Sequence, residues 1–110
     1  MTTPRMPLPD LFRSMNKTEA RRAMELEALR RTGQIAAWWY EKWTWKLADD
    51  CRYTPDFVLQ RPDGSLEVEE IKGFFRDDAQ AKARVFAALF PFPMRVLVLE
   101  KDRWHITTYR

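Results

Sequence analysis

Residues 53–72 read YTPDFVLQRPDGSLEVEEIK, and this stretch decides the fold. Two runs rich in apolar residues flank the turn residues PDG at 62–64, a pattern that predicts a β-hairpin. If these three residues form the loop, the glycine occupies the position that needs a positive φ. Asp56 then lies directly across from Glu70. A two-residue loop would instead place Asp56 opposite Ile71.

The hairpin is predicted to gather two acids and a lysine on one face. Side chains alternate between the faces of a strand, so Glu70 and Lys72 share a face. Two carboxylates directly opposite one another repel, at a cost of up to about 1 kcal/mol, and a bound cation would reverse the sign of that term. Two carboxylates with a nearby lysine suit a hard divalent cation and a phosphate. The simpler interpretation is a charged hairpin in water.

Composition sets modest bounds on function. The chain has 110 residues, of which 45% are hydrophobic, and five are tryptophans, which predicts one globular domain. The net charge of +3 is compatible with nucleic acid as a partner but does not require it. With one histidine and one cysteine, a zinc site or a Cys–His catalytic pair would lack side chains, so any metal must bind oxygen atoms.

The same composition bears on the compartment. A single cysteine, Cys51, excludes an internal disulfide and suits a reducing environment. No apolar run approaches the roughly 20 residues of a membrane span, and no signal peptide is evident. We therefore expect a cytoplasmic protein with no membrane partner.

The pattern predicts two parts, a flexible proline-containing arm over residues 1–13 and a single domain over residues 14–110. The arm is expected to end in an anchoring pair, Leu11 and Phe12. Within the domain we expect helices at 17–32 and 78–90, strands at 35–47, 94–100 and 104–109, and the hairpin at 53–72. Because the strand at 94–100 follows a crossover helix, it should lie parallel to a central strand of a mixed sheet.

This order of elements resembles the PD-(D/E)XK nuclease superfamily and, more closely, a small family of phage endonuclease-like proteins within it. Four stretches carry the resemblance, in order and at fitting spacing: KTEA at 17–20, GQI at 33–35, YTPDF at 53–57 and EIKGF at 70–74. The resemblance covers about residues 14–100. It departs from the family where the usual Gln-Pro is replaced by Glu41 and Lys42.

The resemblance implies an α/β, restriction-endonuclease-like core (α-β-β-β-α-β, a mixed sheet flanked by helices) and metal-dependent hydrolysis of DNA. Asp56, Glu70 and the main-chain carbonyl of Ile71 would hold Mg²⁺ or Mn²⁺. Lys72 would orient the attacking water or offset charge on the phosphate. Glu19 would act from the first helix, through a water on the metal.

Other residues with an implied role have simpler interpretations. Lys82 would face the DNA or the attacking water, and Arg21 and Arg22 would contact phosphates, yet all three could equally form solvated helix faces. Glu19 lies three residues after Asn16, the spacing of a capping box, so a role at the metal would require it to share its side chain.

The Trp-rich stretch also leaves alternatives open. Glu41 is either a charge on an edge strand or a supporting acid of the site. The tryptophans are more typical of a core, although a solvent-facing subset could stack on unpaired bases or build a dimer.

The function that the resemblance implies is a structure-selective endonuclease. A junction resolvase or nickase of phage DNA recombination, acting in the cytoplasm of the host cell, fits best. Resolvases on this fold act as dimers, so a homodimer is an expected state. The alternative is a non-catalytic DNA-binding or assembly subunit that retains the nuclease fold.

Overall fold

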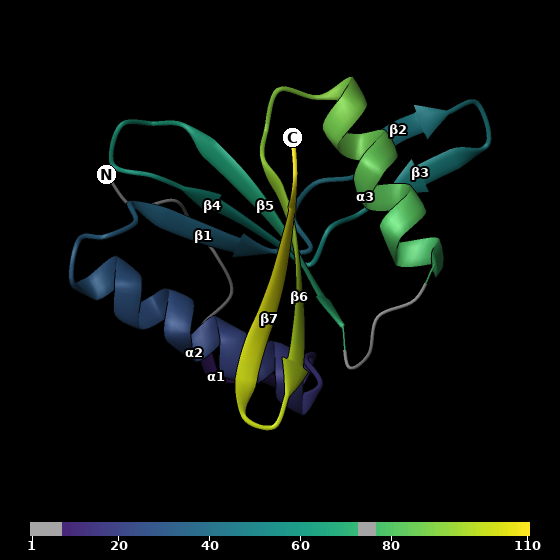
Figure 1. Ribbon diagram of the computed structural model, residues 1–110. Helices are drawn as coiled ribbons and strands as arrows, with labels where there is room; N and C mark the ends of the chain where they lie inside the picture. The colour runs from purple at the N-terminus through teal and green to yellow at the C-terminus, as the bar shows by residue number, and fades with distance from the viewer. Residues whose placement is uncertain (1–7, 73–76) are drawn as a thin grey trace.

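The computed structural model describes residues 8–72 and 77–110, in which helices lie on both sides of a mixed sheet (Figure 1). The helices are α1 (Leu8–Arg13), α2 (Lys17–Arg31) and α3 (Asp77–Leu89). The strands of the five-stranded sheet are, in spatial order, β1 (Ala37–Tyr40), β4 (Phe57–Gln60), β5 (Leu66–Lys72), β6 (Met94–Glu100) and β7 (Arg103–Tyr109). A separate two-stranded hairpin consists of β2 (Trp45–Ala48) and β3 (Cys51–Tyr53).

Helix α2 starts at a side-chain cap, as the sequence predicted. The Asn16 side chain accepts a bond from the Glu19 backbone N–H at 2.8 Å, and the Glu19 carboxylate accepts one from the Asn16 N–H at 3.0 Å. These two bonds satisfy donors that the first turn of a helix leaves free. Gly33, at φ +81°, then lets the chain turn away after the helix.

The register of the β4–β5 hairpin confirms the three-residue loop. Phe57 pairs with Glu69 and Val58 with Val68, which is the alignment that this loop requires. Gly64 has a φ of +91°, a value that a residue with a side chain rarely adopts. The predicted parallel pairing is confirmed too, because β6 runs parallel to β5 after the crossover through α3.

The strand predicted over residues 35–47 is wrong. The chain leaves the sheet after β1, at Glu41, whose φ is +47°. It then forms β2, which pairs with β3 rather than with the main sheet. Trp45 of β2 packs edge-on against Phe86 of α3, with ring centroids 5.2 Å apart. Burial of that aromatic side chain against α3 accounts for the extra hairpin.

The N-terminal arm also differs from the prediction. Residues 8–13, predicted as the end of a flexible arm, form the helix α1. The predicted anchor is confirmed, because Leu11 is buried and Phe12 packs against the same core. The rest of the arm, residues 1–7, lies outside the described residues, as do residues 73–76, which include the last two positions of the EIKGF motif.

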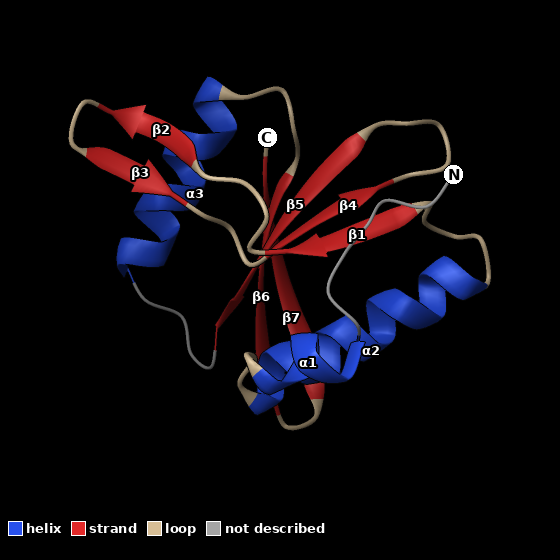
Figure 2. Ribbon diagram, turned by 180° about the vertical axis from the view of Figure 1, so that it is seen from behind, coloured by secondary structure: helices blue, strands red, loops and turns tan. Residues whose placement is uncertain are grey.

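Each face of the sheet has its own core. Figure 2 shows from behind that α2 and α3 lie on different sides of the sheet. On one face α1 and α2 cover side chains that include Phe57, Leu59 and Ile71. On the other, α3 and the β2–β3 hairpin cover Val58 and Val68. Odd and even positions of β5 therefore point into different cores. Among the described helices, none has the length and apolar character needed to cross a membrane.

Candidate active site

Asp56 lies where the β4–β5 ladder opens, one residue before β4 begins. The ladder ends at the pair Phe57–Glu69. Beyond it, the Asp56 carboxylate accepts a hydrogen bond from the Ile71 N–H at 2.8 Å, in place of the next backbone bond. The N–H and C=O of one strand residue point to the same neighbour, so the Ile71 carbonyl is also directed toward the Asp56 side of β5.

Glu70 lies beside Asp56 on the face that α3 covers. It shares this face with Val68, two residues earlier on β5. The Tyr53 hydroxyl donates to one carboxylate oxygen of Glu70 at 2.6 Å, and the Lys72 ammonium lies 3.0 Å from the other. Both acids are buried, with 8% of Asp56 and 9% of Glu70 exposed. The register thus brings together the three residues of the predicted motif.

The electrostatics of this pair are unbalanced toward negative charge. Burial, and then the charge of Glu70, raise the pKa of Asp56 to about 8. The charge of Glu19 raises it further, whereas the Ile71 N–H and Lys72 lower it only in part. A carboxyl group in this state gains from any added positive charge. A bound cation would supply that charge.

Glu19 keeps its cap and also lies within electrostatic reach of Asp56. Besides the Asn16 N–H, the same carboxylate oxygen accepts a bond from the Tyr40 hydroxyl of β1 at 2.9 Å. Its charge acts on both Asp56 and Glu41 and raises the pKa of each. The two interpretations of Glu19 are therefore compatible, because one shared side chain serves the cap while standing near the site.

Glu41, in the turn that follows β1, lies near Asp56, Glu70 and Glu19. It lies outside that strand, so the edge-strand interpretation is wrong. Its N–H donates to the Asp56 carbonyl at 2.9 Å. Burial, followed by the charges of Glu19 and Glu70, raises the pKa of its carboxyl. Glu41 therefore lies within electrostatic reach of the predicted site residues.

The atoms available to a metal are oxygens. Within residues 8–72 and 77–110, no three His, Cys, Asp or Glu side chains are arranged to hold a metal ion. The site instead offers two buried carboxylates, from Asp56 and Glu70, and the carbonyl of Ile71. Hard cations such as Mg²⁺ bind through one or two carboxylates and keep several waters, so this donor set fits them.

The predicted DNA contacts on α2 are engaged elsewhere. Arg22 forms two bonds with the Glu69 carboxylate, at 2.8 and 2.7 Å, and its side chain is only 12% exposed. This pairing disfavours Arg22 as a phosphate contact, because its guanidinium already neutralises a buried acid. Arg21 is more exposed and pairs with Asp102 at 2.6 Å. Lys82 lies exposed on α3, and its predicted role stays a prediction.

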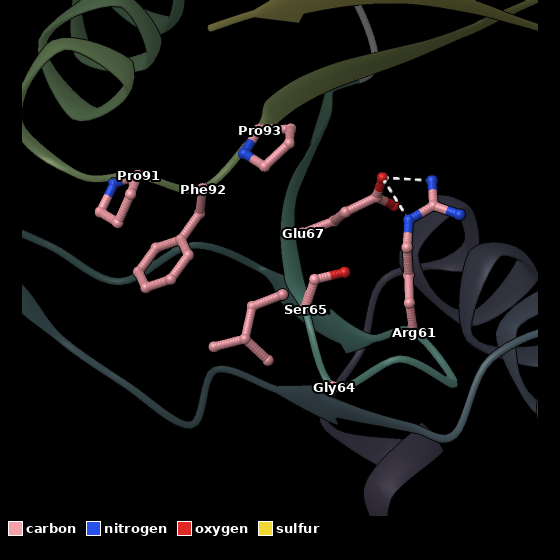
Figure 3. Close-up of a pocket in the computed structure, with 8 residues that line it drawn as sticks. Arg61, Gly64, Ser65, Glu67, Pro91, Phe92 and Pro93 are labelled. Atoms are coloured by element: carbon pink, nitrogen blue, oxygen red, sulfur yellow. Dashed lines mark hydrogen bonds and ion pairs between the residues drawn. The ribbon is translucent and has the colours of Figure 1, made fainter.

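A pocket at the start of β5 is lined by neither Asp56 nor Glu70 (Figure 3). It has a volume of about 390 Å³ and is lined by the β4–β5 turn, by Leu66 and Glu67, and by the loop at 91–93. The acid in this pocket, Glu67, is bonded to Arg61 and Arg95. Its charge is therefore balanced, unlike that of Asp56.

Two tyrosines of the site were missed by sequence reasoning. Tyr53 precedes Asp56 by three residues in the YTPDF stretch, and that position was the only signal for it. Tyr40 lies on β1, and nothing in the sequence connected it with Glu19. Burial raises the pKa of both hydroxyls, so each remains a hydrogen-bond donor to its acid.

In comparisons with known proteins, no family model, no curated protein and no solved structure matches this chain.

Proposed function

We propose that this protein is a metal-dependent DNA endonuclease with a restriction-endonuclease-like core. The observation that carries the proposal is the buried pair Asp56 and Glu70, with Lys72 in contact with Glu70. A buried acid whose pKa is raised, as that of Asp56 is beside Glu70, is typical of catalytic sites. The order α2, β1, β4, β5, α3 and β6 supports the proposed core, with the β2–β3 hairpin as an insertion.

The proposed roles follow from the contacts. Asp56, Glu70 and the Ile71 carbonyl would hold Mg²⁺ or Mn²⁺, which when bound supplies a Lewis acid for the phosphoryl group and lowers the pKa of a bound water. Lys72 would offset charge on the phosphate oxygens. Tyr53 orients the Glu70 carboxylate by its hydrogen bond. Glu19 would add negative charge near a water at the rim of the site.

The proposed substrate is a DNA junction, cut by a resolvase, or a duplex in which one strand is cut by a nickase, as in phage recombination. This choice rests on the resemblance in the four motifs. Arg22 does not support it, since that side chain is bonded to Glu69. Lys82 remains a proposed contact because it is exposed on α3, the helix that covers the same face of the sheet as Glu70.

One gel experiment tests the proposal. Purified protein is incubated with Mg²⁺ or Mn²⁺ and with supercoiled plasmid, a flap and a four-way junction, beside Asp56→Asn. The matched control is Asp50→Asn, which removes an exposed acid from the β2–β3 turn. We expect cleavage by the wild type and the control but not by Asp56→Asn. Binding to the junction without cleavage under any metal would favour the alternative, a non-catalytic DNA-binding subunit.

A further inference from the structure

Strand β7 presents a long outer edge. It pairs with β6 over all seven of its residues, and no other described strand pairs with it. Figure 1 shows it as the last strand of the sheet, on the side nearest the viewer. Most of its side chains are exposed, including Ile106 at 50%. Its sequence, RWHITTY, is rich in aromatic and β-branched residues, which favour strand pairing.

The opposite edge of the sheet is shorter. Strand β1 spans four residues and ends at Tyr40, and the positive φ of Glu41 then turns the chain out of the sheet. Edges are commonly protected by short length, proline, bulges or inward-pointing charges. Strand β7 contains no proline or glycine, and its register with β6 is unbroken from end to end. Of the two edges, β7 is therefore the one suited to further pairing.

The β6–β7 turn determines which backbone groups face outward. Lys101 and Asp102 have φ values of 51° and 65°, as in a type I′ turn, so the Arg103 N–H is directed back to Glu100. Backbone direction alternates along a strand. The N–H and C=O groups of Trp104, Ile106 and Thr108 must consequently point toward the free edge.

We propose that β7 pairs antiparallel with β7 of a second copy of this chain, about a two-fold axis at Ile106. In this register Ile106 faces Ile106 of the second copy, and Trp104 faces Thr108. Each residue whose backbone N–H and C=O point to the free edge therefore faces another such residue. The three pairs on this edge would form about six backbone hydrogen bonds. A shift by one residue would set outward groups against inward ones and lose these bonds.

The same register also matches side chains. Arg110 of the second copy lies opposite Asp102, whose carboxylate is also bonded to Arg21 of its own chain, so unlike charges lie together across the interface. Arg103 lies opposite Tyr109, an arrangement that allows a cation–π contact. The two Ile106 side chains, half exposed in the single chain, cover one another. An interface of this kind is isologous, as in most homodimers.

This pairing is independent of the proposed nuclease activity, since β6 separates β7 from the acids of β5. The first test is the mass in solution by light scattering after gel filtration, at tens of micromolar and above. We expect twice the chain mass of 13.2 kDa. Ile106→Lys should give the single-chain mass, because two lysines would face one another.

The matched control is Met24→Lys, which places a lysine at another exposed apolar position, on α2. It should remain a dimer. A monomeric wild type, or a dimeric Ile106→Lys, would overturn the proposal. Circular dichroism on each variant confirms that a change in mass does not come from unfolding.

A cross-link tests the register itself. In a Cys51→Ser background, Ile106→Cys should form an intermolecular disulfide on mild oxidation. The facing Cα atoms would be about 5.5 Å apart, within the range of about 4.4–6.8 Å that a disulfide spans. Thr107→Cys in the same background is the control. Its two thiols would be offset by about 6.6 Å along the strands and should not join. Equal cross-linking at both positions would exclude the proposed axis.

Discussion

Strand β5 carries buried acids on both of its faces, and the two faces provide them with different partners. On the α2 face, Glu69 is fully buried and is bonded to Arg22 at 2.7 Å and to Arg95 at 2.6 Å. On the α3 face, Glu70 has one cation, Lys72, and the Tyr53 hydroxyl. On that second face the neighbouring Asp56 carboxylate accepts only a backbone N–H among the bonds described.

The difference separates a structural acid from a candidate functional one. Two guanidinium groups offset the cost of burying Glu69, so this network holds α2 and β6 to β5. Around Asp56 the positive charge is too small to prevent a raised pKa. An acid pair that is buried, adjacent and incompletely neutralised gains most from a cation. The face on which no described arginine bonds to the buried acids is therefore the candidate site.

The strongest test of the comparison is Lys72→Ala. We expect cleavage to fall by about 100-fold or more, because the variant loses the cation beside the reacting phosphate. Binding of a labelled junction in Ca²⁺ should change little, since affinity for DNA comes from many contacts. Lys46→Ala, at an exposed lysine on β2, serves as the control. Near wild-type cleavage by Lys72→Ala would remove it from the site.

On the other face, Arg22→Ala should act on stability. Removing one partner of a buried ion pair costs about 3–5 kcal/mol, although Arg95 retains part of the compensation for Glu69. Arg21→Ala, which breaks the exposed pair with Asp102, should cost less than about 1 kcal/mol. Urea unfolding measures both values. Equal effects would mean that burial does not distinguish the two arginines.

The pH dependence of stability tests the charge imbalance at Asp56. Its pKa is raised to about 8 in the folded state, whereas the unfolded chain releases this proton near pH 4. The ionisation of this group therefore has no effect on the free energy of unfolding below about pH 4. It lowers that free energy progressively as pH rises from about 4 to 8, and the loss is constant at higher pH. In metal-free buffer at pH 8.5, Asp56→Asn should raise the free energy of unfolding by on the order of a few kcal/mol.

Mg²⁺ should offset the same loss, because it binds the deprotonated carboxylates. The increase in Tm on adding Mg²⁺ should consequently grow with pH across this window and be absent in Asp56→Asn. Asp50→Asn should behave as the wild type does. A Tm shift that is independent of pH would place the bound cation elsewhere.

Glu19 gives a small expected change in stability and tests where the candidate site ends. Glu19→Ala should cost about 0.5–2 kcal/mol, because the capping box is lost. Glu19→Gln can still accept the bond from the Asn16 N–H, so it should keep the stability but lose most cleavage activity. A stable Glu19→Gln protein with full activity would return Glu19 to a capping role and leave Asp56, Glu70 and Lys72 as the site.

Local sequence signals were enough to predict the elements that depend on neighbouring residues. The turn residues at 62–64 set the hairpin register, because Gly64 takes the positive φ that the last position of a three-residue loop requires. Asn16 and Glu19 set the start of α2 for a similar reason, since both partners of the cap lie within one turn. From these two features follow the pairing of β4 with β5 and the shared face of Glu70 and Lys72.

The tertiary structure decided what depends on residues distant in the chain. The sequence suggested that the arginines of α2 form a solvated, basic side. In the structure, Arg22 is instead bonded to Glu69, 47 positions away. The break after Tyr40 depends on packing of Trp45 against α3, which no local pattern contains. The raised pKa of Asp56 likewise needs burial together with charges from α2 and β5. Burial and charge–charge interactions depend on which residues are close in space. The partners of these side chains could therefore be assigned only after the faces of the sheet were known.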